Sequence, residues 1–282
     1  MTINVTFSDD PARVLTEAGP FLESEPVLHN VILSLLQERA ATPQPGRYWV
    51  ASTNNTISGV VFQSPPTFAA TITPMQADAV VAVVDAIVAA GVALPGVIGD
   101  ATTAARFAGE WTERRKSAAH PHEGQRIYEL GELQEGRSVD GRLRVATATD
   151  RDVIMAWFAG FQDDVGDGDA GGDSEKNVDA RLKAGQYWLW TVGDDNANGE
   201  PVSMSWASPP VAGVSRIGAV YTPPDKRNRG YAEACVRELS RLLQQQDVRC
   251  MLFTQLDNPT SNAIYRHIGY RAIAEALRYR FE

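Results

Sequence analysis

The sequence predicts an α/β fold in which two similar domains follow one another along the chain. Its 282 residues, 44% hydrophobic and 22% charged, are enough for two compact domains with cores of their own. Short apolar runs typical of strands alternate with longer amphipathic stretches typical of helices. The order of these elements in the first half returns in the second, which indicates an internal duplication.

The first predicted domain covers residues 1–133. Two apolar runs joined by a polar turn predict a pair of strands, and two longer stretches predict helices on either side of another short strand. The predicted elements are strands at 48–51, 59–63, 97–99 and 127–130, and helices at 75–89 and 101–114. The polar stretch 134–142 is the predicted linker to the second domain.

The second predicted domain covers residues 143–282 and has two helices near its start, the first begun by Asp150. The predicted elements are strands at 143–147, 187–192, 201–207, 214–221, 248–254 and 278–281, and helices at 151–161, 174–183, 231–245 and 259–268. Both domains place the tripeptide Ser-Pro-Pro after the second strand of a pair, at 64–66 and at 208–210. The strand at 127–130 is expected to close the first domain, as that at 278–281 closes the second.

Composition excludes several classes of function. A net charge of −9 argues against nucleic acid as a general partner. The longest apolar run, residues 79–84, stops at Asp85 and is too short to cross a membrane. Cys235 and Cys250 are expected to be buried fillers, and the four histidines lack the spacing of a metal site. We therefore expect a cytoplasmic protein without a secretion signal, a membrane segment or a metal.

The most informative segment is the junction at 220–232, a strand end, two prolines, a basic turn with one glycine, and then a helix. Such a junction directs unpaired backbone N–H groups and the positive end of the helix dipole to one spot. Anions of the phosphate type bind at such spots. The glycine-rich fingerprints of Rossmann and P-loop folds do not occur in the chain, and an ordinary strand-to-helix loop is the alternative interpretation.

Residues 227–232, Arg-Asn-Arg-Gly-Tyr-Ala, resemble the [Arg/Gln]-x-x-Gly-x-[Gly/Ala] motif of the GNAT-type N-acetyltransferases, and Pro224 stands where that family usually has a proline. In the family, the amides of this turn bind the pyrophosphate of acetyl-CoA, and the end of the preceding strand hydrogen-bonds its pantetheine arm. The resemblance therefore implies acetyl-CoA as the co-substrate. The implied coenzyme-binding residues are Val220, Tyr221 and Thr222 at the strand end and Arg227, Asn228, Arg229, Gly230, Tyr231 and Ala232 in the turn.

The helix after the next predicted strand resembles the second family signature, Asn-x-x-x-Asn-x-x-Tyr-x-x-x-Gly-[Phe/Tyr], with Asn258, Asn262, Tyr265 and Gly269 in register. Asn258 and Asn262 are implied coenzyme contacts, although both also fit helix capping. Asn258 is a typical cap, Pro259 suits the first helical position, and Gly269 the C-terminal end. The two signatures resemble the GNAT family, and with the internal duplication the chain resembles a tandem GNAT protein. The resemblance implies two acetyltransferase-like domains, each a mostly antiparallel central sheet flanked by helices.

The resemblance implies transfer of an acetyl group from acetyl-CoA to a primary amine by direct attack. Tyr265 occupies the family's general-acid position and would protonate the leaving thiolate, whereas a packing tyrosine is the alternative. A backbone N–H of the strand end would hold the carbonyl oxygen. The strand at 214–221 lacks the carboxylate that many family members use as a base, which leaves water, a backbone carbonyl or a distant acid such as Glu275.

The first domain is expected to have lost coenzyme binding. Where the second domain has its basic glycine turn, residues 71–77 contain neither glycine nor arginine, and Phe107 stands near the place of Tyr265. The first domain would then serve as a scaffold, a wall of the acceptor pocket or an interaction surface.

The amine acceptor and the oligomeric state are not apparent from the sequence. The acidic stretch 163–175 is either a lip that attracts a cationic amine or a solvated loop. A non-catalytic acyl-CoA sensor or assembly module is the alternative function, and the missing strand carboxylate favours it slightly.

Overall fold

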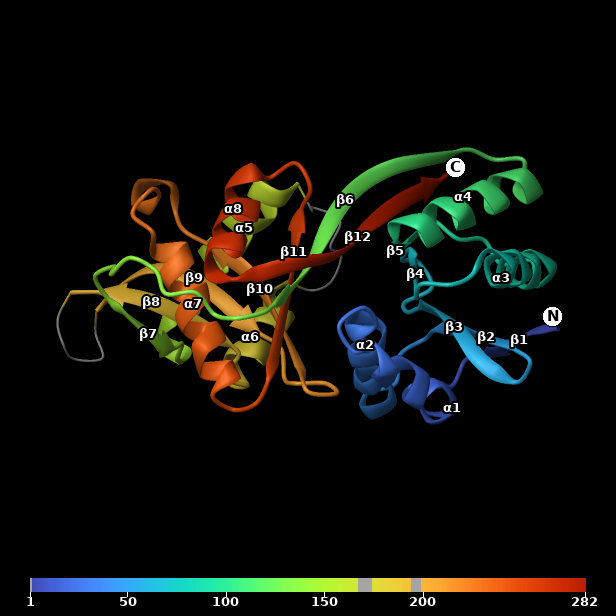
Figure 1. Ribbon diagram of the computed structural model, residues 1–282, viewed down its shortest axis with the longest axis horizontal. Helices are drawn as coiled ribbons and strands as arrows, with labels where there is room; N and C mark the ends of the chain where they lie inside the picture. The colour runs from blue at the N-terminus through green and yellow to red at the C-terminus, as the bar shows by residue number, and fades with distance from the viewer. Residues whose placement is uncertain (1, 167–173, 194–198) are drawn as a thin grey trace. The chain divides into compact units, whose positions relative to one another are not determined.

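The computed structural model describes residues 2–166, 174–193 and 199–282, and it divides into two compact units (Figure 1). Unit 1 consists of Met1–Ile127 together with Ala272–Glu282, and unit 2 is Tyr128–Arg271. In each unit, helices flank a mixed sheet that is mostly antiparallel. The predicted fold class is therefore confirmed. Most of the acidic stretch at 163–175 lies outside the described residues.

Unit 1 begins with a strand and two helices to which the sequence analysis assigned no structure. Asp10 caps the first helix, because its carboxylate accepts hydrogen bonds from the backbone N–H groups of Ala12 and Arg13 and Pro11 takes the first helical position. The elements are β1 (Ile3–Ser8), α1 (Pro11–Ser24), α2 (Asn30–Ala41), β2 (Arg47–Thr53), β3 (Thr56–Gln63), β4 (Ala70–Ile72), α3 (Ala77–Ala89), β5 (Gly96–Asp100), α4 (Ala101–Arg115) and the start of β6 (Ala119–Leu130).

Unit 2 repeats this order after a stretch without regular structure. Its elements are β7 (Arg142–Val145), α5 (Arg151–Val165), α6 (Ser174–Lys183), β8 (Tyr187–Val192), β9 (Glu200–Ala207), β10 (Val214–Tyr221), α7 (Tyr231–Gln244), β11 (Arg249–Gln255), α8 (Pro259–Ile268) and the start of β12 (Tyr270–Phe281). Short 3-10 turns precede α5 and α7.

The described strands form one 12-stranded sheet, and the parts of it that belong to the two units share one pattern of pairing. In unit 1 the order is β1-β2-β3-β4-β5-β12, with β4 parallel to β5 and every other pair antiparallel. In unit 2 the order is β7-β8-β9-β10-β11-β6, and β10 is likewise parallel to β11 while β7 to β10 pair antiparallel. The parallel pair therefore occupies the same place in both units.

The closing strands differ from the sequence-based expectation. Residues Ala276–Arg280 of β12 pair antiparallel with Gly96–Asp100 of β5, so the strand at 278–281 belongs to unit 1. The strand β6 instead ends beside β11 in unit 2, and Figure 1 shows β6 and β12 as two long neighbouring strands. The expectation that 127–130 closes the first sheet and 278–281 the second is wrong. An alternating strand pattern predicts a strand but carries no information about which sheet edge it joins.

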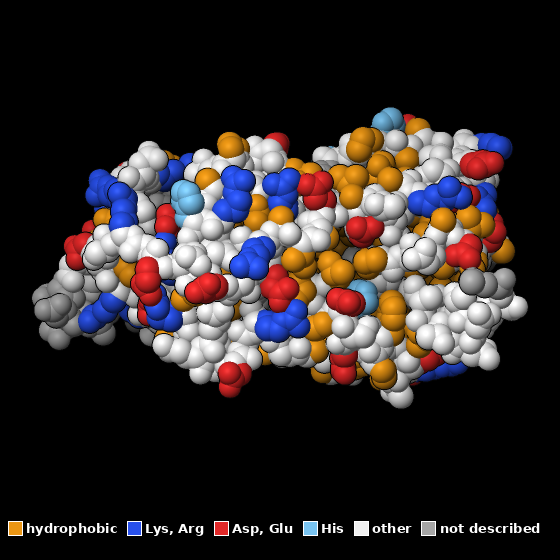
Figure 2. All heavy atoms as spheres, viewed as in Figure 1, with side chains coloured by type: hydrophobic (Ala, Val, Ile, Leu, Met, Phe, Trp, Pro, Cys, Tyr) orange, Lys and Arg blue, Asp and Glu red, His pale blue; other side chains and the backbone are white. Residues whose placement is uncertain are grey.

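Each unit has its own apolar core between sheet and helices. In unit 1, α3 and α4 bury Val83, Phe107 and Trp111 against the strands. In unit 2, α7 and α8 bury Leu239 and Ile268. On the face of the molecule shown in Figure 2, basic and acidic side chains alternate rather than gathering by sign.

Candidate active site

The candidate site in unit 2 begins where β10 separates from its parallel neighbour. The ladder between β10 and β11 runs from Val214 to Ile217. On the other edge, the register between β10 and β9 shifts by one residue between Gly218 and Tyr221, which is a β-bulge. Ala219 within the bulge has a φ of 44°, a left-handed conformation that is unusual for a residue with a side chain. Because the pairing with β11 ends at Ile217, the backbone edge of the bulged strand end has no ladder partner in β11.

The strand end is fixed from β9. The Ser203 hydroxyl donates to the Tyr221 carbonyl oxygen over 3.0 Å, and the Thr222 hydroxyl donates to the Ser203 oxygen over 3.0 Å. The Arg227 Nε donates to the Thr222 carbonyl over 2.9 Å and thereby joins the strand end to the turn that follows. The implied pantetheine-binding backbone at 220–222 and the implied phosphate turn are therefore one connected structure.

The turn before α7 has the conformation that the glycine motif predicts. Asn228 has a φ of 63°, and Gly230, the residue before the first helical position, has a φ of 85°. A glycine is favoured at such a position, because a side chain there is strained. A Cβ added to Gly230 would also lie 3.0 Å from Arg137 Nη2 and 3.2 Å from Val139 Cγ2.

The backbone N–H groups from Asn228 to Glu233 form what we call the amide array. The first hydrogen bond of α7 runs from the Ala234 N–H to the Gly230 carbonyl over 3.0 Å, so the preceding amides have no partner within the helix. Among the residues that the structure describes, none accepts a hydrogen bond from these N–H groups. With the positive end of the helix dipole, the amide array is a site for an anion.

Most cations around the amide array already have carboxylate partners. Lys226 Nζ lies 2.8 Å from Glu200 Oε1, and Arg227 Nη2 lies 2.6 Å from Asp164 Oδ2. The pKa of Lys226 is raised chiefly by its hydrogen bond to Glu200. Arg229 contacts only the Asp225 carbonyl, at 3.5 Å, among the described residues. The backbone rather than Lys226 or Arg227 therefore supplies most of the free donors.

Tyr265 lies in the middle of α8 and is 6% exposed. Its ring contacts Tyr128 and Tyr270, with ring centroids 6.2 and 6.1 Å away. Burial raises the pKa of Tyr265 above its ordinary value, so the hydroxyl stays protonated at neutral pH. Within the described part of the chain its hydroxyl has no hydrogen-bond partner. Tyr265 thus combines the packing role with a free donor.

The two asparagines of the second signature support α8. Asn258 is the N-cap, with its side chain accepting from the Ser261 N–H over 2.9 Å, as the sequence predicts. The Asn262 amide donates to the carbonyl oxygens of Gln255 and Asn258, and its oxygen accepts from the Tyr128 hydroxyl over 2.9 Å. Asn262 therefore ties the start of α8 to the ends of β11 and β6.

Several aromatic residues near the strand end were missed in the sequence analysis. Trp157, Phe158 and Phe161 of α5 pack in the same cluster as Tyr221, and the Trp157 and Tyr221 ring centroids are 6.4 Å apart. Gly160 leaves room for the Tyr221 hydroxyl, since a Cβ there would approach it to 2.5 Å. The signal in the sequence was three aromatic residues within one helix.

The described carboxylates provide no base on β10. Glu275, the distant candidate, forms an ion pair of 2.7 Å with Arg126 in unit 1. Asp164, at the end of α5, is engaged by Arg227. In the described ranges, 2–166, 174–193 and 199–282, no group of three or more His, Cys, Asp or Glu residues could hold a metal ion. Likewise, no helix in these ranges is long and apolar enough to cross a membrane.

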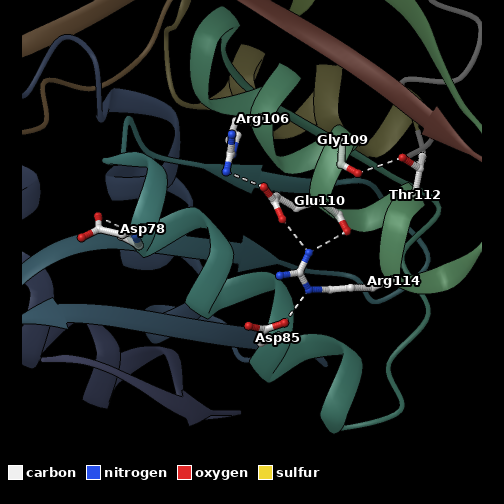
Figure 3. Close-up of polar contacts among 8 residues, drawn as sticks. Asp78, Asp85, Arg106, Gly109, Glu110, Thr112 and Arg114 are labelled. Carbon is white, nitrogen blue, oxygen red and sulfur yellow. Dashed lines mark hydrogen bonds and ion pairs between the residues drawn. The ribbon is translucent and has the colours of Figure 1, made fainter.

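Unit 1 has different contacts at the corresponding place. The Met75 N–H donates to Thr103 Oγ1 over 3.2 Å, and Thr103 also bonds Asp100, the cap of α4. Farther along, Figure 3 shows Arg114 of α4 between Glu110 of the same helix and Asp85 of α3, and its Nη1 lies 2.6 Å from Glu110 Oε2. Side chains of α3 and α4 are thus bonded to one another.

The comparisons with known proteins agree with this geometry. Residues 207–279, which include β10, the turn, α7 and α8, match the family described as FR47-like protein. No curated protein matches the chain.

Solved structures with this fold extend over the whole chain. A GNAT-family acetyltransferase from Colwellia psychrerythraea covers 100% of both chains at 8% identity with a TM-score of 0.61. A GCN5-related N-acetyltransferase from Sphaerobacter thermophilus covers 99% of this chain and 95% of its own at 13% identity, with a TM-score of 0.64. A tandem GNAT protein from the clavulanic acid biosynthesis pathway covers 98% of both at 10% identity, with a TM-score of 0.56. The chain therefore has the fold of a tandem GNAT protein, and its second half contains the segment that matches the FR47-like family.

Proposed function

We propose that the protein is an acetyl-CoA-dependent N-acetyltransferase whose active site lies in unit 2. The observation that carries this proposal is the amide array directly after the bulged end of β10. The coenzyme has a diphosphate at one place along its length and an amide-containing arm leading to the thioester. An anion site followed by an open strand edge matches both parts in that order.

The residues present fit such a ligand. Gly230 has no side chain to block the approach of a diphosphate, and Ala232 adds only a methyl group. The N–H groups of the amide array would donate to the phosphate oxygens. The backbone at 220–222 would hydrogen-bond the pantetheine arm as an added strand does.

The reaction forms a bond between the amine nitrogen and the thioester carbonyl carbon and breaks the bond from that carbon to sulfur. A backbone N–H near Val220 would hold the carbonyl oxygen while it carries negative charge. The nitrogen loses one proton and the sulfur gains one. The ordinary pKa of a tyrosine, 10.0, is already above the thiol value of about 8.5, and burial raises the pKa of Tyr265 further, so this hydroxyl would first act as a hydrogen-bond donor to the departing sulfur. The proton given to sulfur is then balanced by the one that the amine releases.

The proton from the amine has no dedicated acceptor on β10. We propose that water at the strand end receives it and passes it to the solvent, with a backbone carbonyl orienting that water, since Glu275 and Asp164 are each bonded to an arginine. The acceptor amine would enter beside the aromatic cluster of Trp157, Phe158, Phe161 and Tyr221, which favours an amine that carries an apolar group.

Unit 1 would bind no coenzyme. Met75 uses its N–H within the unit, and Phe107 has no proton to donate. We propose a structural role for this unit.

The decisive test is binding of acetyl-CoA by calorimetry to the wild type and to Gly230→Val. We expect the substitution to abolish binding, because a branched side chain at a φ of 85° strains the turn and meets Arg137 and Val139. Gly91→Val, at a φ of 68° in unit 1 with open space around it, is the matched control for backbone strain and should bind normally. Normal binding by Gly230→Val would refute the assignment of the turn.

A non-catalytic acyl-CoA sensor is the second candidate, favoured by the lack of a carboxylate on β10. Thiol release from acetyl-CoA, measured across a panel of primary amines, separates the two. Release with at least one amine identifies an enzyme, whereas binding without release throughout the panel identifies a sensor.

A further inference from the structure

The segment 131–141, which we call the strap, crosses α7 between β6 and β7 (Figure 1). It has no regular secondary structure and lies within unit 2, yet it is anchored at several points. The Gln134 N–H donates to the Ile268 carbonyl over 2.9 Å, and the Asp140 carbonyl accepts from Trp190 Nε1 over 2.9 Å. These bonds fix the strap on both sides of its middle.

The middle of the strap lies on the first turns of α7. Val139 and Tyr231 both pack against the buried cluster that contains Ala234 and Cys235 of α7. Gly136 rests on the Arg237 guanidinium so closely that a Cβ there would meet Arg237 Cζ at 2.0 Å. Arg237 is itself buried and paired with Glu233, so its side chain is fixed and in turn fixes the position of Gly136. Arg137, between these anchored residues, is thereby held at the start of the helix.

The Arg137 guanidinium faces Gly230, in the middle of the amide array. A Cβ built on Gly230 would lie 3.0 Å from Arg137 Nη2 and 3.3 Å from its Nε. The guanidinium is therefore next to a run of unpaired N–H donors and at the positive end of a helix dipole. The guanidinium carries a full positive charge and the N–H groups carry partial positive charges, so their proximity is unfavourable unless an anion binds between them.

Arg137 differs from three neighbouring cations of the amide array in having no carboxylate partner among the described residues. Lys226, Arg227 and Arg237 have carboxylate partners in Glu200, Asp164 and Glu233. Arg137, by contrast, has no carboxylate partner in the part of the chain that the structure describes. A guanidinium presents paired N–H donors in a planar fork that matches two phosphate oxygens.

We propose that Arg137 is a ligand of the coenzyme diphosphate, supplied by the strap to the site that the backbone of unit 2 forms. This inference rests on the proposed function and extends it to a residue outside both sequence signatures. The diphosphate, rather than the 3′-phosphate of the coenzyme, is the assigned partner because Gly230 lies within the amide array and not at its edge.

The test compares the affinity of the wild type, Arg137→Met and Arg137→Lys for coenzyme A and for 3′-dephospho-coenzyme A by calorimetry. Arg271→Met is the matched control, since it removes the same charge from another residue of unit 2 that has no carboxylate partner among the described residues. We expect Arg137→Met to weaken both ligands about tenfold, the usual effect of losing a charged hydrogen bond. Arg137→Lys should recover part of this loss, and Arg271→Met should change little. Thermal unfolding of each variant verifies that it is folded.

The outcomes are distinct. A wild type that binds neither ligand overturns the proposed function and this inference together. A wild type that binds, with Arg137→Met equal to it or to Arg271→Met, overturns this inference alone. A loss with coenzyme A that disappears with the dephospho form assigns Arg137 to the 3′-phosphate and overturns the diphosphate assignment.

Discussion

Units 1 and 2 have the same arrangement of strands and helices, but they differ at the turn that joins the first strand of the parallel pair to the following helix. In both, an antiparallel run of strands leads to a parallel pair, and a helix follows the first strand of that pair. In unit 2 that strand has eight residues, is bulged, and continues into a turn with Gly230 at its end. In unit 1 the corresponding strand β4 has three residues, and the Met75 side chain packs onto Gly59 close to the start of α3.

The difference extends to where the backbone donors go. Unit 1 uses the Met75 N–H for a bond to Thr103 and the Ala79 N–H for a bond to the Asp78 carboxylate, which also places a negative charge at the start of α3. Unit 2 leaves its amide array free among the described residues. The shared arrangement of strands and helices is thus independent of the site, because local side-chain hydrogen bonds satisfy this turn where a ligand would otherwise do so.

The second helix of each unit makes the same contrast. Tyr265 is the seventh residue after the cap Asn258, and Phe107 is the seventh after the cap Asp100. Both are buried, but Phe107 stacks with Trp111 and Phe281, whereas Tyr265 retains a hydroxyl. One position therefore serves packing alone in unit 1 and packing with a donor in unit 2.

The largest effect is expected from truncating the unit 1 residue of this pair. Phe107→Ala should lower the free energy of unfolding by about 3–5 kcal/mol, because it leaves a cavity inside the aromatic stack. Denaturant titration measures it, with Phe68→Ala, at a 42% exposed phenylalanine, as the control. A loss no greater than that of the control would mean that Phe107 is not a core residue of unit 1.

The unit 2 residue should matter for chemistry instead. Tyr265→Phe keeps the ring contacts and should lower kcat by about one to three orders of magnitude, with little change in acetyl-CoA affinity. Steady-state kinetics with an amine found in the panel, together with calorimetry, measures both quantities. An unchanged kcat would remove Tyr265 from the mechanism and make the two positions alike.

The smallest expected effect concerns pH and a histidine of unit 1. His29 is 4% exposed, and its Nδ1 lies 3.2 Å from the Leu22 carbonyl oxygen. Burial lowers the pKa of His29 below its ordinary 6.5, so the unfolded chain takes up a proton before the folded chain does. Stability is therefore independent of this group above pH 6.5 and falls as the pH drops below that value.

At one pH unit below its ordinary pKa, the protonation of His29 in the unfolded chain lowers the free energy of unfolding by at most about 1.4 kcal/mol. Denaturant titrations at pH 7.5 and 5.5 should show a smaller loss on acidification for His29→Asn than for the wild type. His267→Asn, at an exposed histidine of unit 2, should behave like the wild type. Equal losses in all three proteins would contradict a neutral His29 in the folded state.

The parts of the fold that depend on local chemistry were predictable from the sequence. Asn258, Pro259 and Gly269 mark the ends of α8 because capping involves only neighbouring residues. The glycine turn was predictable for the same reason, since Gly230 needs a positive φ. The residues that cause each of these features lie within a few positions of it in the sequence.

The parts that depend on distant partners were not predictable. The choice of sheet for β12 depends on β5, which lies far away in the sequence. Arg137 looked like part of a polar linker, because its position at Gly230 arises only when the strap folds over α7. The bulge after Gly218 likewise depends on the register with β9.

The placement of the last strands has a consequence for dividing the chain. A fragment that ends after residue 127 would lack β12, so β5 would present bare N–H and C=O groups along one side. Such an exposed edge invites pairing with other molecules, which causes insolubility or exchange of segments between copies. Expression of either half by itself is therefore a poor route to an isolated catalytic fragment. A better design joins the missing strand to the fragment that needs it through a short loop.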